Sequence, residues 1–450
     1  MLNRKISAKA IAVFALILTV VAVLTGLTVY RFAKKDFDHQ MRLLREAQAE
    51  ELASLEESLT AKTFDLDPLL ALDRLYSSHS LSDADKDALT EYLLYAYASG
   101  VGDPYSLYMS ADDYTAYLER QSSRFVGIGV SVSAEMTQTE QGDGLTVLTV
   151  YRDSPAAEGG LLAGDVLLSA DGIGFSGKSQ QEAAALVRGE EGSSVFLTYL
   201  RNGQLSSLTL TRRSVTEDTV RFEMLPNGIA YIVINRFSSA TAEQLEEAVK
   251  ACSDENAQAF VFDVRNNPGG LVSSSAECLG FLLPDGDLIH VNYRKTKEND
   301  YTYRTKDGTL LRTTKSGEDA VTTATEMAHA LSCPVAVLIN ENTASAGELF
   351  AAALRDYRDR NLLNARLFGE KTFGKGTVQA TYRMAGGGAF KLSVATYKPP
   401  YGECFDGVGI TPDQTVSLPE EYYKNPILSI PREKDTQLQA AVDWLGTFIQ

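Results

Sequence analysis

Ser345 lies in a segment whose residue types suit a nucleophile. The segment NTASAGE, residues 342–348, falls between an expected strand and an expected helix. Small neighbours leave the Ser345 hydroxyl accessible at the helix N-terminus, where the positive end of the helix dipole favours developing negative charge. Thr343 stands where the related nucleophile elbow has its first glycine. A serine at a helix start is more often an N-cap, so its position alone favours capping.

A Ser-His-Asp triad has no obvious base for Ser345, because none of the four histidines lies in the segments that carry chemistry. Lys375 has a glycine on each side, and it can act as a base if it is kept neutral. Lowering its pKa from about 10.4 to about 7–8 costs roughly 4 kcal/mol, which burial can supply. Nearby carboxylates oppose this, so Glu348 and Glu370 are expected to point away. Lys371 is the competing base, and a solvated surface charge is the commoner role of either lysine.

The lysine segment GEKTFGKGTVQ, residues 369–379, nearly matches a phosphate-binding Walker loop. Gly376 stands where the metal-binding Ser or Thr belongs, and a strand is expected next instead of a helix, so the segment does not indicate an NTPase. Gln379 can orient Lys375 through its amide only if the chain bends near Gly376. An extended strand would separate the two residues by about 13 Å.

A third segment, DVRNNPGG over residues 263–270, follows a strongly apolar strand. Gly269 and Gly270 at the strand end can bring backbone N–H groups to a substrate carbonyl, as an oxyanion hole requires. An ordinary Gly-Gly turn is the better interpretation of this segment in isolation.

Closely spaced glycines also mark a peptide-binding domain. Gly127, Ile128, Gly129 and Val130 precede a strand, and their N–H groups can point into one space that suits a carboxylate. A peptide can then pair with the adjacent strand edge. The segments GLLAGD and DG follow at 160–165 and 171–172, and a helix over 180–188 is expected to place Leu186 toward the groove. This order resembles a PDZ domain of the bacterial protease type; a PDZ fold whose groove binds nothing is the alternative.

Apolar strands alternate with helices in the C-terminal half, which predicts a mainly parallel sheet covered by helices. The expected strands are 229–237, 260–265, 335–340 and 366–368, and the expected helices are 242–251, 273–283, 320–331 and 346–357. Residues 286–314 are expected to form a solvated hairpin. Residues 36–120 are expected to be helical, with one helix capped by Ser82 and ending at Ser99.

Composition and the N-terminal region limit the class of protein. The net charge of −17 argues against nucleic acid binding, which needs a basic face. The four cysteines form no CxxC pair, so neither a zinc site nor a redox motif is expected. Residues 11–30 are predominantly apolar and long enough to span a bilayer, with basic residues on both sides. We expect an uncleaved transmembrane anchor, whose orientation the charges do not decide.

The three segments, in this order behind a PDZ domain, resemble the carboxyl-terminal processing peptidases. The resemblance extends from DPYS at 103–106 to GVGITPD at 407–413. It implies Ser345 as nucleophile, Lys375 as general base and Gln379 as its orienting partner. It further implies oxyanion donors from the Ala346 N–H and from Gly269-Gly270. The stretch 360–365 is longer than is usual in the family, which affects the expected local geometry rather than the identity of the pair.

The expected protein is therefore a multidomain α/β serine endopeptidase that captures protein C-termini in its PDZ groove. The resemblance implies a Clp-protease/crotonase-like catalytic domain outside the cytoplasm, on a single-pass cell-membrane protein that needs no metal or other cofactor. A further expectation is a homodimer that forms through the helical run near Leu52 or the tail 437–448. The alternative for both segments is packing within one chain. The alternative function is an inactive PDZ scaffold.

The expected organisation is an N-terminal tail (1–10), a transmembrane anchor (11–30), a helical region (31–120), a PDZ domain (121–215), a peptidase domain (216–420) and a C-terminal tail (421–450).

Overall fold

The computed structural model describes residues 65–323, 331–423 and 425–449. The expected anchor at 11–30 and the helical run near Leu52 lie outside these residues. Within them, every helix is too short or too polar to span a bilayer. The chain divides into two compact units, 1–89 and 90–450.

Two helices follow the start of the described chain, α2 (Asp67–His79) and α3 (Lys86–Gly100). The expected cap at Ser82 is wrong, because α3 begins four residues later. The Asp85 carboxylate instead accepts hydrogen bonds from the N–H groups of Asp87 and Ala88, at 3.1 and 3.0 Å. A carboxylate at this position satisfies two donors of the first turn and suits the positive helix end.

The glycine-rich segment forms a PDZ-type β-domain. Its main sheet has the strand order β3-β5-β6-β8-β9, and α6 packs on its core. A side chain at Gly129, where φ is +83°, would lie 2.2 Å from Ser154 Cβ, so the turn before β3 requires glycine. The elements are β3 (Val130–Val132), β4 (Thr137–Thr139), β5 (Gly142–Val150), α5 (Pro155–Glu158), β6 (Val166–Ala170), β7 (Ile173–Gly174), α6 (Gln180–Val187), β8 (Ser194–Arg201) and β9 (Gln204–Thr211).

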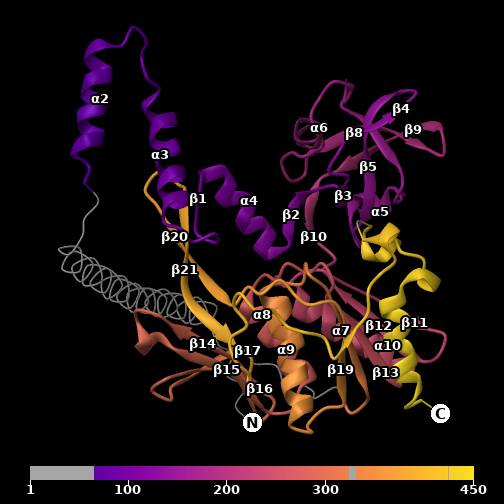
Figure 1. Cartoon of the computed structure of the whole chain (residues 1–450). Coiled ribbons are helices and arrows are strands. Elements are labelled where there is room, and N and C mark those ends of the chain that lie inside the picture. The colour runs from indigo at the N-terminus through magenta and orange to yellow at the C-terminus, as the bar shows by residue number, and fades with distance from the viewer. Residues whose placement is uncertain (1–64, 324–330, 424, 450) are drawn as a thin grey trace, which may run out of the picture. The chain divides into compact units, whose positions relative to one another are not determined.

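The expected parallel sheet is confirmed in the C-terminal half (Figure 1). Its order is β11-β12-β13-β18-β19-β22, and only the β11–β12 pair is antiparallel. Its strands are β11 (Val220–Leu225), β12 (Ile229–Ile234), β13 (Ala259–Asp263), β18 (Val335–Ile339), β19 (Ala365–Gly369) and β22 (Gln414–Thr415).

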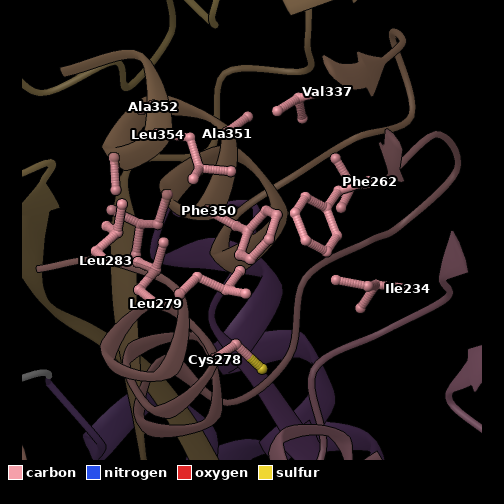
Figure 2. Packing of buried hydrophobic residues seen from close by; sticks show 14 of the residues in the cluster. Ile234, Phe262, Cys278, Leu279, Leu283, Val337, Phe350, Ala351, Ala352 and Leu354 are labelled. Atoms are coloured by element: carbon pink, nitrogen blue, oxygen red, sulfur yellow. The ribbon is translucent and has the colours of Figure 1, made fainter. Parts of the chain in front are cut away.

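Helices bury both faces of this sheet, which explains why its strands are continuous apolar runs. The main core includes residues of α7 (Thr241–Asp254), α8 (Val272–Leu282) and α9 (Ala346–Asp359), and α10 (Thr436–Gly446) packs in a second cluster with alternate strand residues. Figure 2 shows Phe262 of β13 beside Phe350 of α9, with ring centroids 5.8 Å apart.

A second sheet completes the catalytic region. It has the order β1-β21-β14-β15-β16-β17, with β20 also paired to β21. The expected solvated hairpin at 286–314 therefore belongs to a larger sheet, because Tyr303 and Leu310 are buried in the main core. The expected helix at 320–331 begins as strand, and its remainder lies outside the described residues. The strands are β1 (Leu107–Met109), β14 (Gly286–Tyr293), β15 (Tyr301–Lys306), β16 (Thr309–Thr314), β17 (Asp319–Thr323), β20 (Thr377–Arg383) and β21 (Ala389–Lys398).

Shorter elements connect these layers. The helix α4 leads into a two-stranded ribbon of β2 and β10, which holds the entry and exit of the PDZ domain together. The bounds are α4 (Ala111–Ser122), β2 (Arg124–Gly127), β10 (Arg213–Thr216) and the 3-10 turns η2 (Lys297–Asn299), η3 (Glu420–Tyr422), η4 (Ile427–Ser429) and η5 (Arg432–Lys434).

Candidate active site

Ser345 lies at the sharp turn between β18 and α9. Its backbone has φ +57° and ψ −121°, a conformation that L residues rarely adopt and that occurs at functional sites. The Ser345 N–H donates to Glu348 Oε2 at 2.8 Å, which fixes the turn. The turn therefore has the strained strand-to-helix character of a nucleophile elbow, although Thr343 replaces its first glycine.

The Ser345 hydroxyl is hydrogen-bonded to a tyrosine. Tyr397 on β21 places its hydroxyl 2.9 Å from Ser345 Oγ and 2.5 Å from the backbone oxygen of Lys375. The single phenol proton is shared between two acceptors, Ser345 Oγ and the Lys375 carbonyl oxygen. The Ser345 proton is therefore not used in this contact.

Lys375 lines the same cleft as Ser345, in a cavity of about 640 Å³. Burial lowers the pKa of Lys375 to about 8, and the positive charge of Lys391 adds to this effect, while Asp103 and Glu348 oppose it. Its Nζ lies 4.6 Å from the centroid of the Tyr105 ring. Among the hydrogen bonds of the described chain, none joins Lys375 Nζ to Ser345 Oγ. The competing Lys371 is exposed and does not line the cleft.

The expectation that Glu348 points away from the site is wrong. Glu348 is fully buried and accepts four hydrogen bonds, from the N–H groups of Ser345, Gly374 and Lys375 and from the Thr372 hydroxyl, at 2.6–2.8 Å. These donors come from both catalytic segments. The carboxylate therefore joins the nucleophile turn to the lysine loop, and its four donors compensate the charge that burial would otherwise penalise.

Glu370 points away from the cleft, as expected. Its carboxylate accepts hydrogen bonds from the hydroxyls of Ser417 and Tyr423, both at 2.8 Å. It is absent from the residues that line the cleft, and it does not contribute to the pKa shift of Lys375.

The glycine pair lies against the nucleophile turn. A Cβ on Gly269, where φ is +95°, would lie 2.7 Å from Ser345 Cβ and 2.9 Å from Ala346 N. The Gly269 N–H already donates to Asn267 Oδ1 at 2.8 Å. Among the described hydrogen bonds, none uses the N–H of Gly270 or of Ala346. Of the three oxyanion donors that the sequence indicated, the N–H groups of Gly270 and Ala346 therefore have no partner among the described hydrogen bonds.

Gln379 lines the cleft, but its amide contacts other residues. Its Nε2 donates to Thr377 Oγ1 at 2.9 Å and to Ser393 Oγ at 3.2 Å. No described hydrogen bond connects it to Lys375. The strand Thr377–Arg383 begins after Gly376 and has an irregularity between Val378 and Gln379, and both Gln379 and Lys375 line the cleft.

The DPYS segment lies beside the lysine. Asp103 accepts hydrogen bonds from the Ser106 hydroxyl and the Tyr105 N–H, at 2.5 and 3.0 Å. Ser106 Oγ in turn accepts the N–H of Ser393 on β21, at 3.2 Å. These contacts position the Tyr105 ring beside Lys375 Nζ.

The predicted peptide groove is a separate cavity of about 540 Å³. Gly127, Ile128, Gly129 and Val130 line it, together with one face of α6 that includes Gln180, Ala184 and Val187. Leu186 does not line it and instead packs, half-buried, against the PDZ core, because the groove face of α6 repeats at the helical spacing of 180, 184 and 187. Ala116, Glu119 and Arg120 of α4 also line this groove.

Comparisons with known proteins agree with this architecture. Residues 228–416 match the model of peptidase family S41, and residues 126–211 match the PDZ domain model. A CtpA-like serine protease of Staphylococcus haemolyticus (strain JCSC1435) is 30% identical over 432 residues, which are 96% of this chain and 77% of that protein. Carboxy-terminal processing protease CtpA of Bacillus subtilis (strain 168) is 32% identical over 76% of this chain and 67% of the relative. The chain spans 63% of a relative from Staphylococcus epidermidis (strain ATCC 12228 / FDA PCI 1200).

Among solved structures, an S41 protease from Bacteroides fragilis NCTC 9343 has a TM-score of 0.50 at 18% identity, over 83% of this chain and 94% of that chain, which shows a shared fold. The fold and the site define a serine-type peptidase with a PDZ domain. The chain belongs to the CtpA-like carboxy-terminal processing proteases of peptidase family S41.

Two contacts at this site were missed by sequence reasoning. Tyr397 lies 52 residues after Ser345, in a strand with an ordinary β-rich composition, so no local signal marks it. Tyr105 is part of the DPYS motif, but only the fold brings its ring to Lys375.

Proposed function

We propose that this peptidase cleaves polypeptides with Ser345 as nucleophile and Lys375 as general base. The observation that carries the proposal is the presence of both side chains in one cleft, with the pKa of Lys375 lowered by burial to about 8. A neutral amine is then accessible near physiological pH, as a general base requires.

The reaction follows from these roles. Neutral Lys375 takes the Ser345 proton as Oγ attacks the scissile carbonyl, and the N–H groups of Ala346 and Gly270 stabilise the oxyanion. The lysine ammonium then protonates the departing amine and leaves an acyl-enzyme. Water, activated again by neutral Lys375, releases the product and regenerates the serine. Before attack, the Ser345 hydroxyl proton must be directed to Lys375, and we assign this alignment to substrate binding.

Hydrolysis of an unfolded protein by wild type, Ser345→Ala and Lys375→Ala tests this mechanism. Lys371→Ala is the matched control, because that lysine is exposed and outside the cleft. We expect activity in wild type and Lys371→Ala only. Equal hydrolysis by all four proteins would refute the Ser/Lys assignment. No hydrolysis by any of them, with retained peptide binding, would favour the inactive PDZ scaffold.

We further propose that the PDZ groove captures the free C-terminus of the substrate. The glycine-rich turn before β3 and the face of α6 line a groove of the size that a peptide needs, beside a strand edge. A full-length Ser345→Ala protein should bind a labelled peptide with a free carboxylate and not its amide. Ala184→Arg should block the groove, whereas Ala185→Arg, on an exposed position of the same helix, should not. Equal binding by both variants would argue against groove capture.

The membrane anchor at 11–30, the extracytoplasmic location and the homodimer remain proposals from the sequence. In the tail, Leu438, Ala441 and Leu445 of α10 are buried within the chain, whereas Phe448 is 47% exposed. Fractionation of cells that express the full chain, or a chain without residues 1–35, tests the anchor. Protease accessibility in intact and permeabilised cells tests the location, and the mass of the solubilised protein tests the dimer.

A further inference from the structure

The active-site cleft has a charge opposite to that of the whole chain. The chain has a net charge of −17, yet the cleft is lined by four cationic side chains and one carboxylate. These charged residues are Asp113, Arg120, Arg236, Lys375 and Lys391. The imbalance indicates an anionic ligand if the cations are not already neutralised by the protein.

Two of these charges already have partners. Arg236 pairs with Glu217 at 3.1 Å. Asp113 accepts hydrogen bonds from the hydroxyls of Ser110 and Tyr95, both at 2.8 Å, and these bonds hold the pKa of its carboxyl below the ordinary value. Asp113 is therefore a stable anion in the same cleft, and the positive charge of Arg120 also contributes to its lowered pKa, although the two side chains form no ion pair among the described residues.

Arg120 and Lys391 differ from these residues. Among the ion pairs of the described residues, none includes either side chain. Lys391 Nζ lies 5.3 Å from the centroid of the Tyr117 ring. A ring face attracts a cation, but it does not neutralise the charge or satisfy the three N–H donors of an ammonium.

The two cations lie on neighbouring parts of the same cleft wall. Tyr117 and Arg120 both line the cleft and are three residues apart on α4, which puts their Cβ atoms about 5–6 Å apart on one helix face. Lys391 on β21 contacts the ring of Tyr117. Tyr117 is thus a neighbour of both cations on this wall.

Strand register places this wall at a defined distance from the nucleophile. Lys391 precedes Tyr397 by six residues on β21, with an irregularity opposite Val378 and Gln379. Six strand residues span about 16–20 Å, and an extended peptide advances about 3.3 Å per residue. Since the lysine side chain shortens this path, the wall corresponds to about three to five substrate residues from the scissile bond.

We propose that Lys391 and Arg120 form a subsite that binds a carboxylate of the substrate, about three to five residues from the scissile bond. This inference rests on the proposed peptidase function and names a substrate class for it. The carboxylate belongs either to an Asp or Glu side chain or to the substrate's own C-terminus, and both offer the same acceptor geometry.

Occupation of this subsite has a second consequence. The charge of Lys391 is one of the causes that lower the pKa of Lys375, against Asp103 and Glu348, which raise it. A carboxylate bound to Lys391 offsets its charge. Acidic substrates should therefore show a higher pH midpoint for catalysis than neutral substrates, and removal of the Lys391 charge should raise the midpoint for neutral ones.

The test uses internally quenched peptides in which one Gln is exchanged for Glu at each position within five residues of the cleavage site. A second pair of peptides ends within five residues of the cleavage site. One peptide of this pair has a free C-terminus and the other has an amidated C-terminus. For wild type we expect at least one Glu position, or the free carboxylate, to raise kcat/KM by about tenfold over its neutral partner. The two series distinguish a side-chain carboxylate from a terminal one.

Variants then locate the preference. In Lys391→Gln the ratio between acidic and neutral peptides should fall toward one, and in Lys391→Arg it should be largely retained. Lys398→Gln, at the end of the same strand and outside the cleft, should keep the wild-type ratio. Arg120→Gln should reduce the ratio as well, although Arg120 also lines the PDZ groove. Each ratio is measured at a pH well above the midpoint for both substrates, where Lys375 is neutral in each complex, so the influence of the Lys391 charge on Lys375 does not enter it.

The outcomes separate this inference from the function on which it rests. One outcome is that wild type cleaves neutral peptides, Ser345→Ala does not, and no carboxylate is preferred. This outcome overturns the proposed subsite and leaves the peptidase mechanism intact. A preference that persists in the double variant Lys391→Gln, Arg120→Gln also overturns it. Absence of all serine-dependent cleavage overturns the proposed peptidase mechanism, and the subsite with it.

Discussion

The hydroxyl of Tyr397 lies 2.9 Å from Ser345 Oγ and is also hydrogen-bonded to the backbone oxygen of Lys375. One buried phenol thus contacts the nucleophile and the chain segment that carries the base. Its burial raises the pKa of Tyr397 well above the ordinary value, so the phenol is neutral and keeps its single proton. The phenol donates to Ser345 Oγ, so this contact does not use the proton that the base must remove.

Tyr397→Phe should lower both stability and turnover. The Lys375 carbonyl loses its donor, and an unpaired buried acceptor costs about 1–3 kcal/mol. The lysine loop also loses a positional constraint, so kcat should fall about 10- to 100-fold with little change in KM. Denaturant unfolding and steady-state kinetics measure the two effects. Tyr92→Phe, at a position that is 73% exposed, should change neither. Wild-type turnover in Tyr397→Phe would contradict a positioning role.

The pH dependence of cleavage should report the base. Since Lys375 acts only when neutral and its pKa is lowered to about 8, kcat/KM should rise as pH increases through about 8 and level off above it. Protonation below this pH removes the base, which fixes the sign of the effect. Lys375→Arg should be inactive across the range, because a guanidinium remains charged. A rate that is constant between about pH 6 and about pH 10 would be incompatible with this base.

Glu348→Gln should destabilise the protein by about 2–4 kcal/mol. The carboxylate accepts four hydrogen bonds, and an amide turns one of its acceptors into an NH₂ group that faces N–H donors. Chemical unfolding measures the loss. Glu370→Gln is the matched control, because its two partners are surface hydroxyls, and it should change stability by no more than about 0.5 kcal/mol. Equal stability of the two variants would argue against Glu348 as the link between the catalytic segments.

Asp435→Ala should test the attachment of the C-terminal helix. The Asp435 carboxylate accepts two hydrogen bonds from the Arg265 guanidinium, at 2.8 and 2.7 Å, and both side chains are fully buried. Removing one partner of a buried pair costs about 3–5 kcal/mol. Because Arg265 directly precedes the loop that leads to Gly269, activity should also fall. Asp443→Ala on the exposed face of the same helix should have little effect on unfolding or on activity. A small loss in Asp435→Ala would show that Asp263 alone suffices for Arg265.

Local patterns predicted the secondary structure around the site well. The apolar runs at 229–237, 260–265 and 335–340 form β12, β13 and β18, since a strand buried on both faces needs an uninterrupted apolar sequence. The helix expected from Ala346 was found with the same first residue. The start of α3 was predicted four residues too early, because Ser82 and Asp85 are both good caps and only one of them meets free N–H groups.

The sequence by itself determined which segments form the central parallel strands and the helix that follows Ser345, and it limited the base to two lysines. Local composition is sufficient for this, because periodicity and glycine placement act on neighbouring residues. Only the tertiary structure distinguished buried Lys375 from exposed Lys371, turned Glu348 inward and brought Tyr397 to Ser345. These outcomes depend on how distant strands pair and on which side chains lose contact with water, and neither property belongs to a single segment.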